Sequence, residues 1–412
     1  MVTRRIFLRG SAIVMAGMGA VPSWLARAAA VEGKKRKILV AIFLRGAADG
    51  LNIVVPFSEK RYHDLRPNLA IAPPTRQNNN NPGPFNGPAI DLDGSFALNG
   101  AMQPLKALWD NKQLAIVEAT GSPDSSRSHF DAQDYMESGT SGKATGDGWL
   151  NRALSPAGPD TSPLRAVSMG NQVSRTLRGD HEAIALGDSQ QFNMGNQDAA
   201  SILESMYSSS GDAKWGHTGK NAFDAMKLIQ SVNRTTDYPQ NGAQYQQGGE
   251  LGRNLQQLAR LIKADAGVEA AFAEIGGWDH HGNENQQLSN LLRQFSSALL
   301  AFSKDMGDRM EDIVLVTMSE FGRTVQENGN AGTDHGHGSM MMVLGGPVQG
   351  GKVYGKWPGL EREQLFEGRD LAVTTDFRSV LGELIRGHLG QKDLAPVFPG
   401  YQPSDPLGLL RS

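Results

Sequence analysis

Short apolar runs alternate with longer amphipathic segments along most of the chain. Continuous apolar runs of this length are typical of strands buried on both faces of a parallel sheet. They occur at residues 37–43, 114–118, 164–169, 183–186, 268–275, 312–317 and 340–344. Helical spacing of apolar residues predicts helices at about 101–110, 130–137, 199–234, 251–264, 284–310 and 376–388. Strands alternating with helices predict an α/β fold with a doubly wound, mainly parallel sheet.

The chain of 412 residues shows no internal repeat and no linker that forces a second domain. We therefore expect a single domain over residues 31–412. A tract of four asparagines at 78–81, among prolines and glycines, predicts a surface loop insertion at about 67–100.

The first thirty residues have the pattern of an export signal. Arg4 and Arg5 form a twin-arginine pair, an apolar stretch follows at 12–25, and small residues offer cleavage after Ala28 or Ala30. The alternative, a membrane anchor, needs about 20 apolar residues, and this stretch is shorter. We expect residues 1–30 to be a twin-arginine signal peptide. The protein would then interact with the twin-arginine export machinery and be periplasmic or secreted, without a membrane span after cleavage.

Composition removes several function classes. Cysteine is absent, which excludes disulfides, thiol nucleophiles and iron–sulfur clusters. The net charge of −3, from 40 basic and 43 acidic residues, offers no basic footprint for nucleic acid. A redox protein is the weakest functional hypothesis. No G-x-G-x-x-G nucleotide loop follows a predicted strand, which counts against it.

Carboxylates and histidines collect where predicted strands end, which is where α/β sheets bind ligands. The candidate metal ligands are Asp49, Asp279, His281, Glu320, Asp334, His335 and His337. Mixed carboxylate and imidazole ligands favour Zn²⁺, with Mn²⁺ or Fe²⁺ as alternatives, in a site of one or two ions. For single residues other roles stay open: Asp49 could cap a helix, and Glu320 could be solvated at the rim of the sheet.

The same loops contain candidates for catalysis. Ser128 is a possible nucleophile with His129 beside it, although several serines lie nearby. Arg45, Arg127 and Arg323 could donate to the oxygens of an anionic ester. Ordinary ion pairs are the alternative for these arginines, and we expect that role for at least one of them.

Five segments, together with the twin-arginine leader, carry a family resemblance. They are FLRGAADGLN at 43–52, SHFDAQDY at 128–135, GWDHHG at 277–282, SEFGRT at 319–324 and GTDHG at 332–336. This combination resembles the exported bacterial family labelled domain of unknown function 1501. That family is grouped with the alkaline phosphatase and sulfatase superfamily, which implies an alkaline phosphatase-like α/β core with divalent metals at the strand ends.

The resemblance implies roles for particular residues. Asp49 would bind one metal, Asp279 and His281 the other, and 334–337 would supply the late Asp-His pair and its neighbouring histidine. Ser128 lies near the expected nucleophile, but the spacing is off by about one residue, so His129 could occupy that place. The Asp-His pair also comes some fourteen residues after Glu320 rather than directly at the strand end. The cysteine that many sulfatases convert into their nucleophile is missing, which excludes that chemistry.

These observations lead to two functional hypotheses of different classes. The first is a periplasmic metal-dependent hydrolase of a phosphate or sulfate ester, attacked by Ser128 or by a water molecule activated by the metal. The second is a non-catalytic, metal-containing envelope protein that binds a glycan or a protein partner. The uncertain nucleophile favours the second hypothesis.

Overall fold

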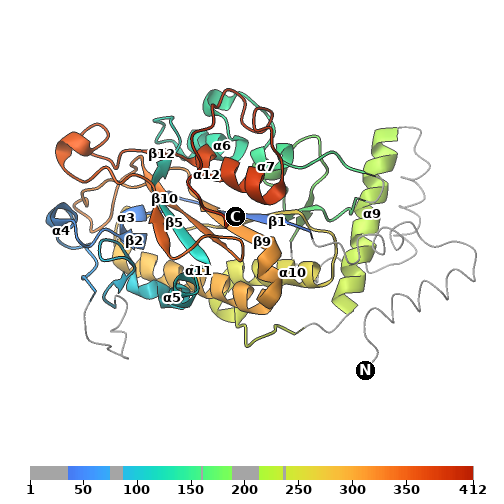
Figure 1. The fold of residues 1–412 in the computed structure, drawn as a ribbon, viewed down its shortest axis with the longest axis horizontal. Coiled ribbons are helices and arrows are strands. Elements are labelled where there is room, and N and C mark those ends of the chain that lie inside the picture. The colour runs from blue at the N-terminus through green and yellow to red at the C-terminus, as the bar shows by residue number, and fades with distance from the viewer. Residues whose placement is uncertain (1–35, 75–86, 159–160, 188–212, 235–237, 412) are drawn as a thin grey trace, which may run out of the picture.

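The fold is built on one large sheet. The computed structural model describes residues 36–74, 87–158, 161–187, 213–234 and 238–411, so the predicted signal peptide lies outside the described residues. The strands run in the order β11-β5-β10-β9-β1-β8-β6-β7, and β12 pairs with β5 (Figure 1). Their bounds are β1 Ile38–Leu44, β5 Leu114–Gly121, β6 Ala166–Met169, β7 Ile184–Leu186, β8 Ala270–Ile275, β9 Ile313–Met318, β10 Ser339–Gly345, β11 Lys352–Tyr354 and β12 Thr375–Asp376.

Helices cover both faces of this sheet. The α-helices are α3 Gly50–Ile53, α4 Lys60–Leu65, α5 Gln103–Asp110, α6 His129–Ser138, α7 Trp149–Arg152, α9 Ala213–Arg234, α10 Gly249–Lys263, α11 Glu284–Met306 and α12 Phe377–Leu384. Shorter helical turns are η1 Gly100–Met102, η2 Ser141–Lys143, η3 Arg175–Leu177, η5 Tyr245–Gly248, η6 Gly307–Asp312, η7 Arg362–Gln364 and η8 Ile385–Leu389. Helices α5, α10 and α11 lie on one side, and α6, α7 and α12 on the other (Figure 1).

Strand β1 shows why its sequence is apolar without interruption. Val40 and Ile42 pack in the core with α5, α10 and α11, whereas Leu39 and Ala41 pack in the core with α7 and α12. Successive side chains of a strand point to opposite faces, so a strand covered on both sides must be apolar throughout. The predicted α/β fold with a mostly parallel central sheet is confirmed.

The direction of the strands decides where a site can form. β1 runs parallel to β8 and β9, and β10 runs antiparallel to both β9 and β5. The carboxyl ends of β1, β5, β8 and β9 therefore share one edge of the sheet. Because β10 is reversed, the residues that precede it reach the same edge.

The expected loop insertion at 67–100 is only partly a loop. Two short strands in it, β3 (Ile90–Asp91) and β4 (Ala97–Leu98), form a second sheet with β2 (Val54–Val55). The asparagine tract lies in 75–86, outside the described residues. The first part of the helix predicted at 199–234 also lies outside them.

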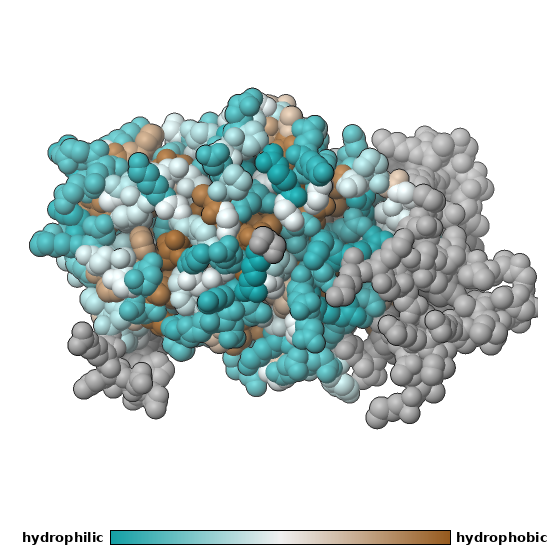
Figure 2. Space-filling model, viewed as in Figure 1, coloured by the Kyte–Doolittle hydropathy of each residue, from teal (hydrophilic) through white to brown (hydrophobic). Residues whose placement is uncertain are grey.

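In the part of the chain that is described, no helix combines the length and apolar character needed to cross a membrane. Hydrophilic side chains cover most of the face shown in Figure 2.

The buried face of α11 should dominate its contribution to stability. Phe302 is fully buried in the core beneath the sheet. We expect Phe302→Ala to lower the free energy of unfolding by about 3–5 kcal/mol, because it removes apolar contacts and leaves a cavity. Phe130→Ala is the matched control, since Phe130 is 87% exposed, and should change that free energy by less than about 0.5 kcal/mol. Urea denaturation measures both, and equal losses would contradict this account of the core.

Candidate functional site

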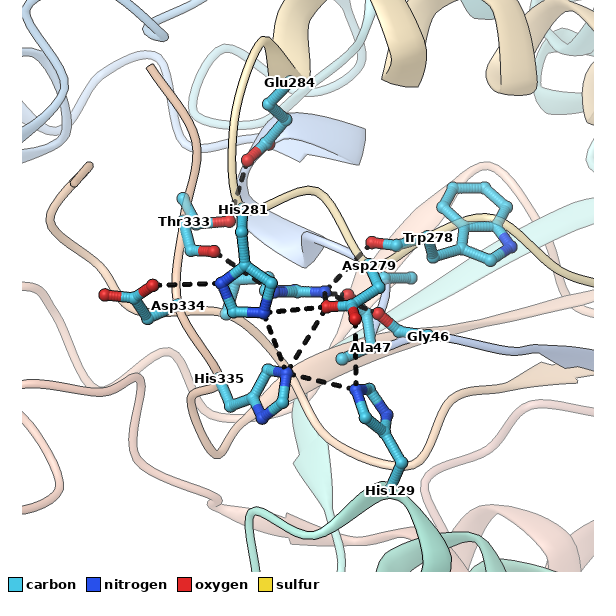
Figure 3. Close-up of polar contacts among 12 residues, drawn as sticks. Gly46, Ala47, His129, Trp278, Asp279, His281, Glu284, Thr333, Asp334 and His335 are labelled. Carbon is cyan, nitrogen blue, oxygen red and sulfur yellow. Dashed lines mark hydrogen bonds and ion pairs between the residues drawn. The ribbon is translucent and has the colours of Figure 1, made fainter. Parts of the chain in front are cut away.

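Three histidines and an aspartate meet at the carboxyl edge of the sheet. Asp279 and His281 follow β8, and His335 lies in the loop that precedes β10. His129 is the first residue of α6, in the connection that follows β5. Figure 3 shows the three rings and the Asp279 carboxylate turned toward one another.

The atoms at the centre are close. His335 Nε2 lies 3.1 Å from His129 Nε2 and 3.1 Å from His281 Nε2. Asp279 Oδ1 lies 3.0 Å from His281 Nε2 and 3.3 Å from His335 Nε2. Each of His129, Asp279 and His335 offers an atom within 4.8 Å of the other two. These three residues form a compact group, and the His281 ring lies against two of them, Asp279 and His335.

The far side of each ring contacts an oxygen that accepts hydrogen bonds. The pairs are His129 Nδ1 with Glu320 Oε1 at 2.8 Å, His281 Nδ1 with Asp334 Oδ1 at 3.0 Å, and His335 Nδ1 with the carbonyl of Arg127 at 3.0 Å. A carbonyl or ionised carboxylate can only accept, so each Nδ1 must carry the proton. When such a ring is neutral, its Nε2 carries no proton and has a lone pair that can bind a metal.

Hydrogen bonds, burial and nearby charges shift the pKa values of several groups around the rings. The hydrogen bond to Glu320 raises the pKa of His129, which favours the protonated form of this ring. Burial alone would raise the pKa of Glu320, but hydrogen bonds from His129 and Gln133 bring it below its ordinary value. The hydrogen bond from His281 lowers the pKa of Asp334. Burial and the charge of Arg323 lower the pKa of His335, which favours its neutral form.

This arrangement fits a divalent metal. Nε2 atoms and a carboxylate oxygen gathered in this way are suited to a cation lying among them. Neighbouring ligand atoms in a tetrahedral zinc site with nitrogen ligands lie roughly 3.3 Å apart, close to the separations found here. Ligating histidines usually donate their other ring nitrogen to a carboxylate or carbonyl, as all three do. Among the described residues, no second group of histidines and carboxylates of this kind is found.

Arg323 fixes the loops that carry the ligands. Its side chain is fully buried and its Nη2 donates to Asp279 Oδ1 at 2.5 Å. It also donates to four backbone carbonyls, those of Gly46, Ala47, Trp278 and Thr333. Burial raises and the Arg323 hydrogen bond lowers the pKa of Asp279, with a net decrease. Asp279 is therefore held as a carboxylate, and all three nitrogens of the guanidinium are occupied.

Close packing of the backbone completes the site. Gly46 has φ of 118°, and a Cβ there would lie 2.7 Å from the backbone nitrogen of Asp279. Phe321 packs under the rings of His129 and His335, with both centroid distances 5.1 Å. Gly46 in the loop after β1 and Phe321 in the loop after β9 therefore restrict where the ligands can lie.

Comparison with known protein families gives a match over most of the chain. The family model described as "Protein of unknown function (DUF1501)" matches residues 36–392, which include every residue of the cluster. The chain belongs to the DUF1501 family. No curated protein matches it in sequence.

Of the predicted ligands of this DUF1501 protein, Asp279, His281 and His335 come together at the centre. Glu320 and Asp334 lie one step further out and orient His129 and His281. His129, which we expected to take part in catalysis, contributes a ring nitrogen to the cluster itself.

Asp49 does not join the cluster, contrary to the expectation that it binds a metal. Its two carboxylate oxygens accept from Nη1 and Nη2 of Arg66, at 2.5 and 3.0 Å, and both side chains are buried. Burial would raise the pKa of Asp49, but the Arg66 charge lowers it overall. Burial and the neighbouring Asp49 charge raise the pKa of Glu284 well above its ordinary value. Asp49 is therefore paired with Arg66 and not with the histidines of the cluster.

His337 also lies apart from the metal cluster. Its ring stacks on Phe366 with a centroid distance of 4.2 Å. Ser128 is exposed at the N-cap of α6, and its side chain does not cap the helix.

Two of the three arginines expected to donate to an anionic ester are engaged elsewhere. Arg45 donates from all three guanidinium nitrogens, to Glu274, Gln133 and Glu137. All three guanidinium nitrogens of Arg323 donate to Asp279 and to the backbone carbonyls described above. An ion-pair role, the alternative left open for such arginines, holds for Arg45.

Several residues that contact the site were not predicted from the sequence. Gln133 donates to Glu320 Oε1 at 3.0 Å, on the same oxygen as His129. His129 and Gln133 are four residues apart in α6, so helical spacing places them on one face and could have revealed this pair. Arg66 and Thr333 carry no such signal, because their partners are distant in the sequence.

The Asp49–Arg66 pair supports a stability prediction. Arg66→Met should lower the free energy of unfolding by about 3–5 kcal/mol, because it leaves Asp49 buried and uncompensated. Arg309→Met is the matched control, since the Arg309–Asp265 pair of 2.8 Å is about half exposed, and should cost less than about 1 kcal/mol. Chemical denaturation compares the two. Equal effects would show that Arg66 does not compensate a buried charge.

Proposed function

We propose that this protein is a metal-dependent hydrolase of a phosphate or sulfate ester. The observation that carries the proposal is the convergence of three Nε2 atoms and the Asp279 carboxylate. His129, Asp279 and His335 form the core of the ligand set, and His281 adds a third nitrogen. Imidazole and carboxylate ligands favour Zn²⁺, with Mn²⁺ or Fe²⁺ as alternatives.

When bound there, a divalent ion would lower the pKa of a water molecule and polarise the ester oxygen. The protein's own groups set the conditions for this chemistry. Glu320 and Asp334 accept hydrogen bonds from Nδ1 and so make His129 and His281 stronger electron donors. Arg323 holds Asp279 ionised and in place. Phe321 supports two of the rings from below.

The nucleophile we favour is water rather than Ser128. A serine nucleophile needs a base within hydrogen-bonding reach. The ring of the adjacent His129 is committed at both nitrogens, to Glu320 and to the cluster. Ser128 therefore has no such base in its neighbour.

Membership of the alkaline phosphatase and sulfatase superfamily is part of this proposal. The mostly parallel sheet and the cluster at its carboxyl edge support it.

We further propose twin-arginine export to the periplasm, on the strength of the leader sequence at residues 1–30. A folded metal site assembled before transport is compatible with a chain that has no cysteine.

Elemental analysis of the purified protein tests the metal centre. We expect roughly one divalent ion per chain in the wild type and its loss in His335→Ala, because His335 contacts every other member of the cluster. His337→Ala is the matched control, two residues away in the same loop, and should keep the ion. Circular dichroism verifies that both variants fold.

Two results would overturn the metal centre. One is a wild-type protein that stays free of metal after loading with zinc, manganese and iron. The other is full retention of the ion in a folded His335→Ala variant. Bound metal without turnover of any ester would instead support the non-catalytic binding protein.

Turnover distinguishes the two nucleophiles. With a panel of phosphate and sulfate esters, we expect Ser128→Ala to keep kcat/KM within about threefold of wild type, because water attacks. Ser122→Ala controls for the loss of a serine in the same loop. A decrease of about a thousandfold or more in Ser128→Ala alone would identify Ser128 as the nucleophile instead.

A further inference from the structure

Two arginines beside the metal cluster are held by one buried carboxylate. Asp370 is fully buried, and its oxygens accept from Nε and Nη2 of both Arg127 and Arg369, at 2.7 to 3.1 Å. A buried carboxylate that receives two planar guanidinium groups fixes their orientation. The pair is therefore preorganised rather than two independent surface side chains.

Both arginines are tied directly to His335. The carbonyl of Arg127 accepts from His335 Nδ1 at 3.0 Å, and Nη2 of Arg369 donates to the carbonyl of His335 at 2.6 Å. Arg127 also lies two residues before His129. The pair thus borders the cluster through the backbone of one ligand and the segment that leads to another.

Free donors remain on this pair. Within the described structure, Nη1 of Arg127 and Nη1 of Arg369 have no hydrogen-bond partner, and the two side chains are 29% and 46% exposed. The contrast with Arg323 and Arg45 is clear, because those guanidinium groups are used by the protein itself. The guanidinium of Arg127 lies 6.0 Å from the ring centroid of Phe366, which also stacks on His337.

An exposed acidic side chain neutralises part of this charge. Glu367 Oε2 accepts from Arg127 Nη2 at 2.6 Å, and its side chain is 56% exposed. Ion pairs with an exposed partner are weak and readily exchanged. A ligand oxyanion can therefore take the place of the Glu367 carboxylate on Arg127.

We propose that Arg127 and Arg369, oriented by Asp370, form an oxyanion subsite for a second phosphate or sulfate group of the substrate. The substrate is then an ester with two anionic groups, one at the metal cluster and one at this pair. This inference rests on the proposed function for its substrate class, whereas the anion site can be tested without turnover. Glu367 occupies part of the subsite when the anion is absent.

Isothermal titration calorimetry with inorganic phosphate and sulfate, on chelator-treated protein at low ionic strength, tests the subsite. Arg369→Gln and Arg127→Gln should each weaken binding about ten- to a hundredfold, because each removes a charge-assisted hydrogen-bond donor. Arg369→Lys keeps the charge without the fork and should fall between. Arg362→Gln makes the same charge change at an exposed position of the same loop and should leave binding unchanged.

Glu367→Gln gives a result that structural damage cannot imitate. It removes the competing carboxylate, so phosphate should bind about threefold more tightly. The proposal is overturned if Arg369→Gln binds phosphate like wild type, if Arg362→Gln weakens binding equally, or if wild-type protein binds neither anion. If metal binding or ester turnover fails while the anion results hold, the proposed hydrolase fails and the oxyanion site stands. If turnover is found, KM should rise in Arg369→Gln only for esters with a second anionic group.

Discussion

The architecture of the site depends on the buried guanidinium of Arg323. A buried charge is tolerated only when it is paired and its donors are satisfied. Here the pairing group is Asp279, and the remaining donors require carbonyls from the loops after β1 and β8 and from the segment before β10. These loops must therefore meet around one cation whether or not a metal is present. The ligands are positioned by the protein's own charge balance.

The reversal of one strand allows ligands from distant parts of the sequence to meet. His129 and His335 are separated by 206 residues, yet their Nε2 atoms lie 3.1 Å apart. His129 follows the carboxyl end of β5, and His335 lies just before the antiparallel strand β10. A fully parallel sheet would place the start of β10 at the opposite edge. The mixed topology is thus a requirement of the site.

Much of this could be predicted from the sequence, because strands buried on both faces give continuous apolar runs. The runs at 37–43 and 312–317 became β1 and β9 within a residue or two, and the polar loops beyond them hold the site. The short strands β11 and β12 have three and two residues, too few for a periodic pattern. Of the two histidines in the Asp-His-Gly-His segment at 334–337, only His335 lies in the cluster.

The partner of a charged side chain is what the sequence could not predict. Asp49 and Arg45 lie in the expected loop after β1, yet Asp49 pairs with Arg66, and Arg45 lies between Glu137 and Glu274. Sequence spacing identifies which loop carries a charge, whereas three-dimensional packing decides what it faces. The role assigned to a residue therefore depends on burial more than on motif.

Burial also divides the arginines of this site by role. Arg323 is fully enclosed, so every donor is used by the protein and none can follow a substrate. Arg127 and Arg369 lie at the rim, where a donor on each stays free to exchange with solvent and anions. A cation that must hold loops together needs saturated hydrogen bonds, whereas one that binds a ligand needs an unused donor. The same side chain can satisfy only one of these conditions, which is why recognition falls to the arginines at the rim.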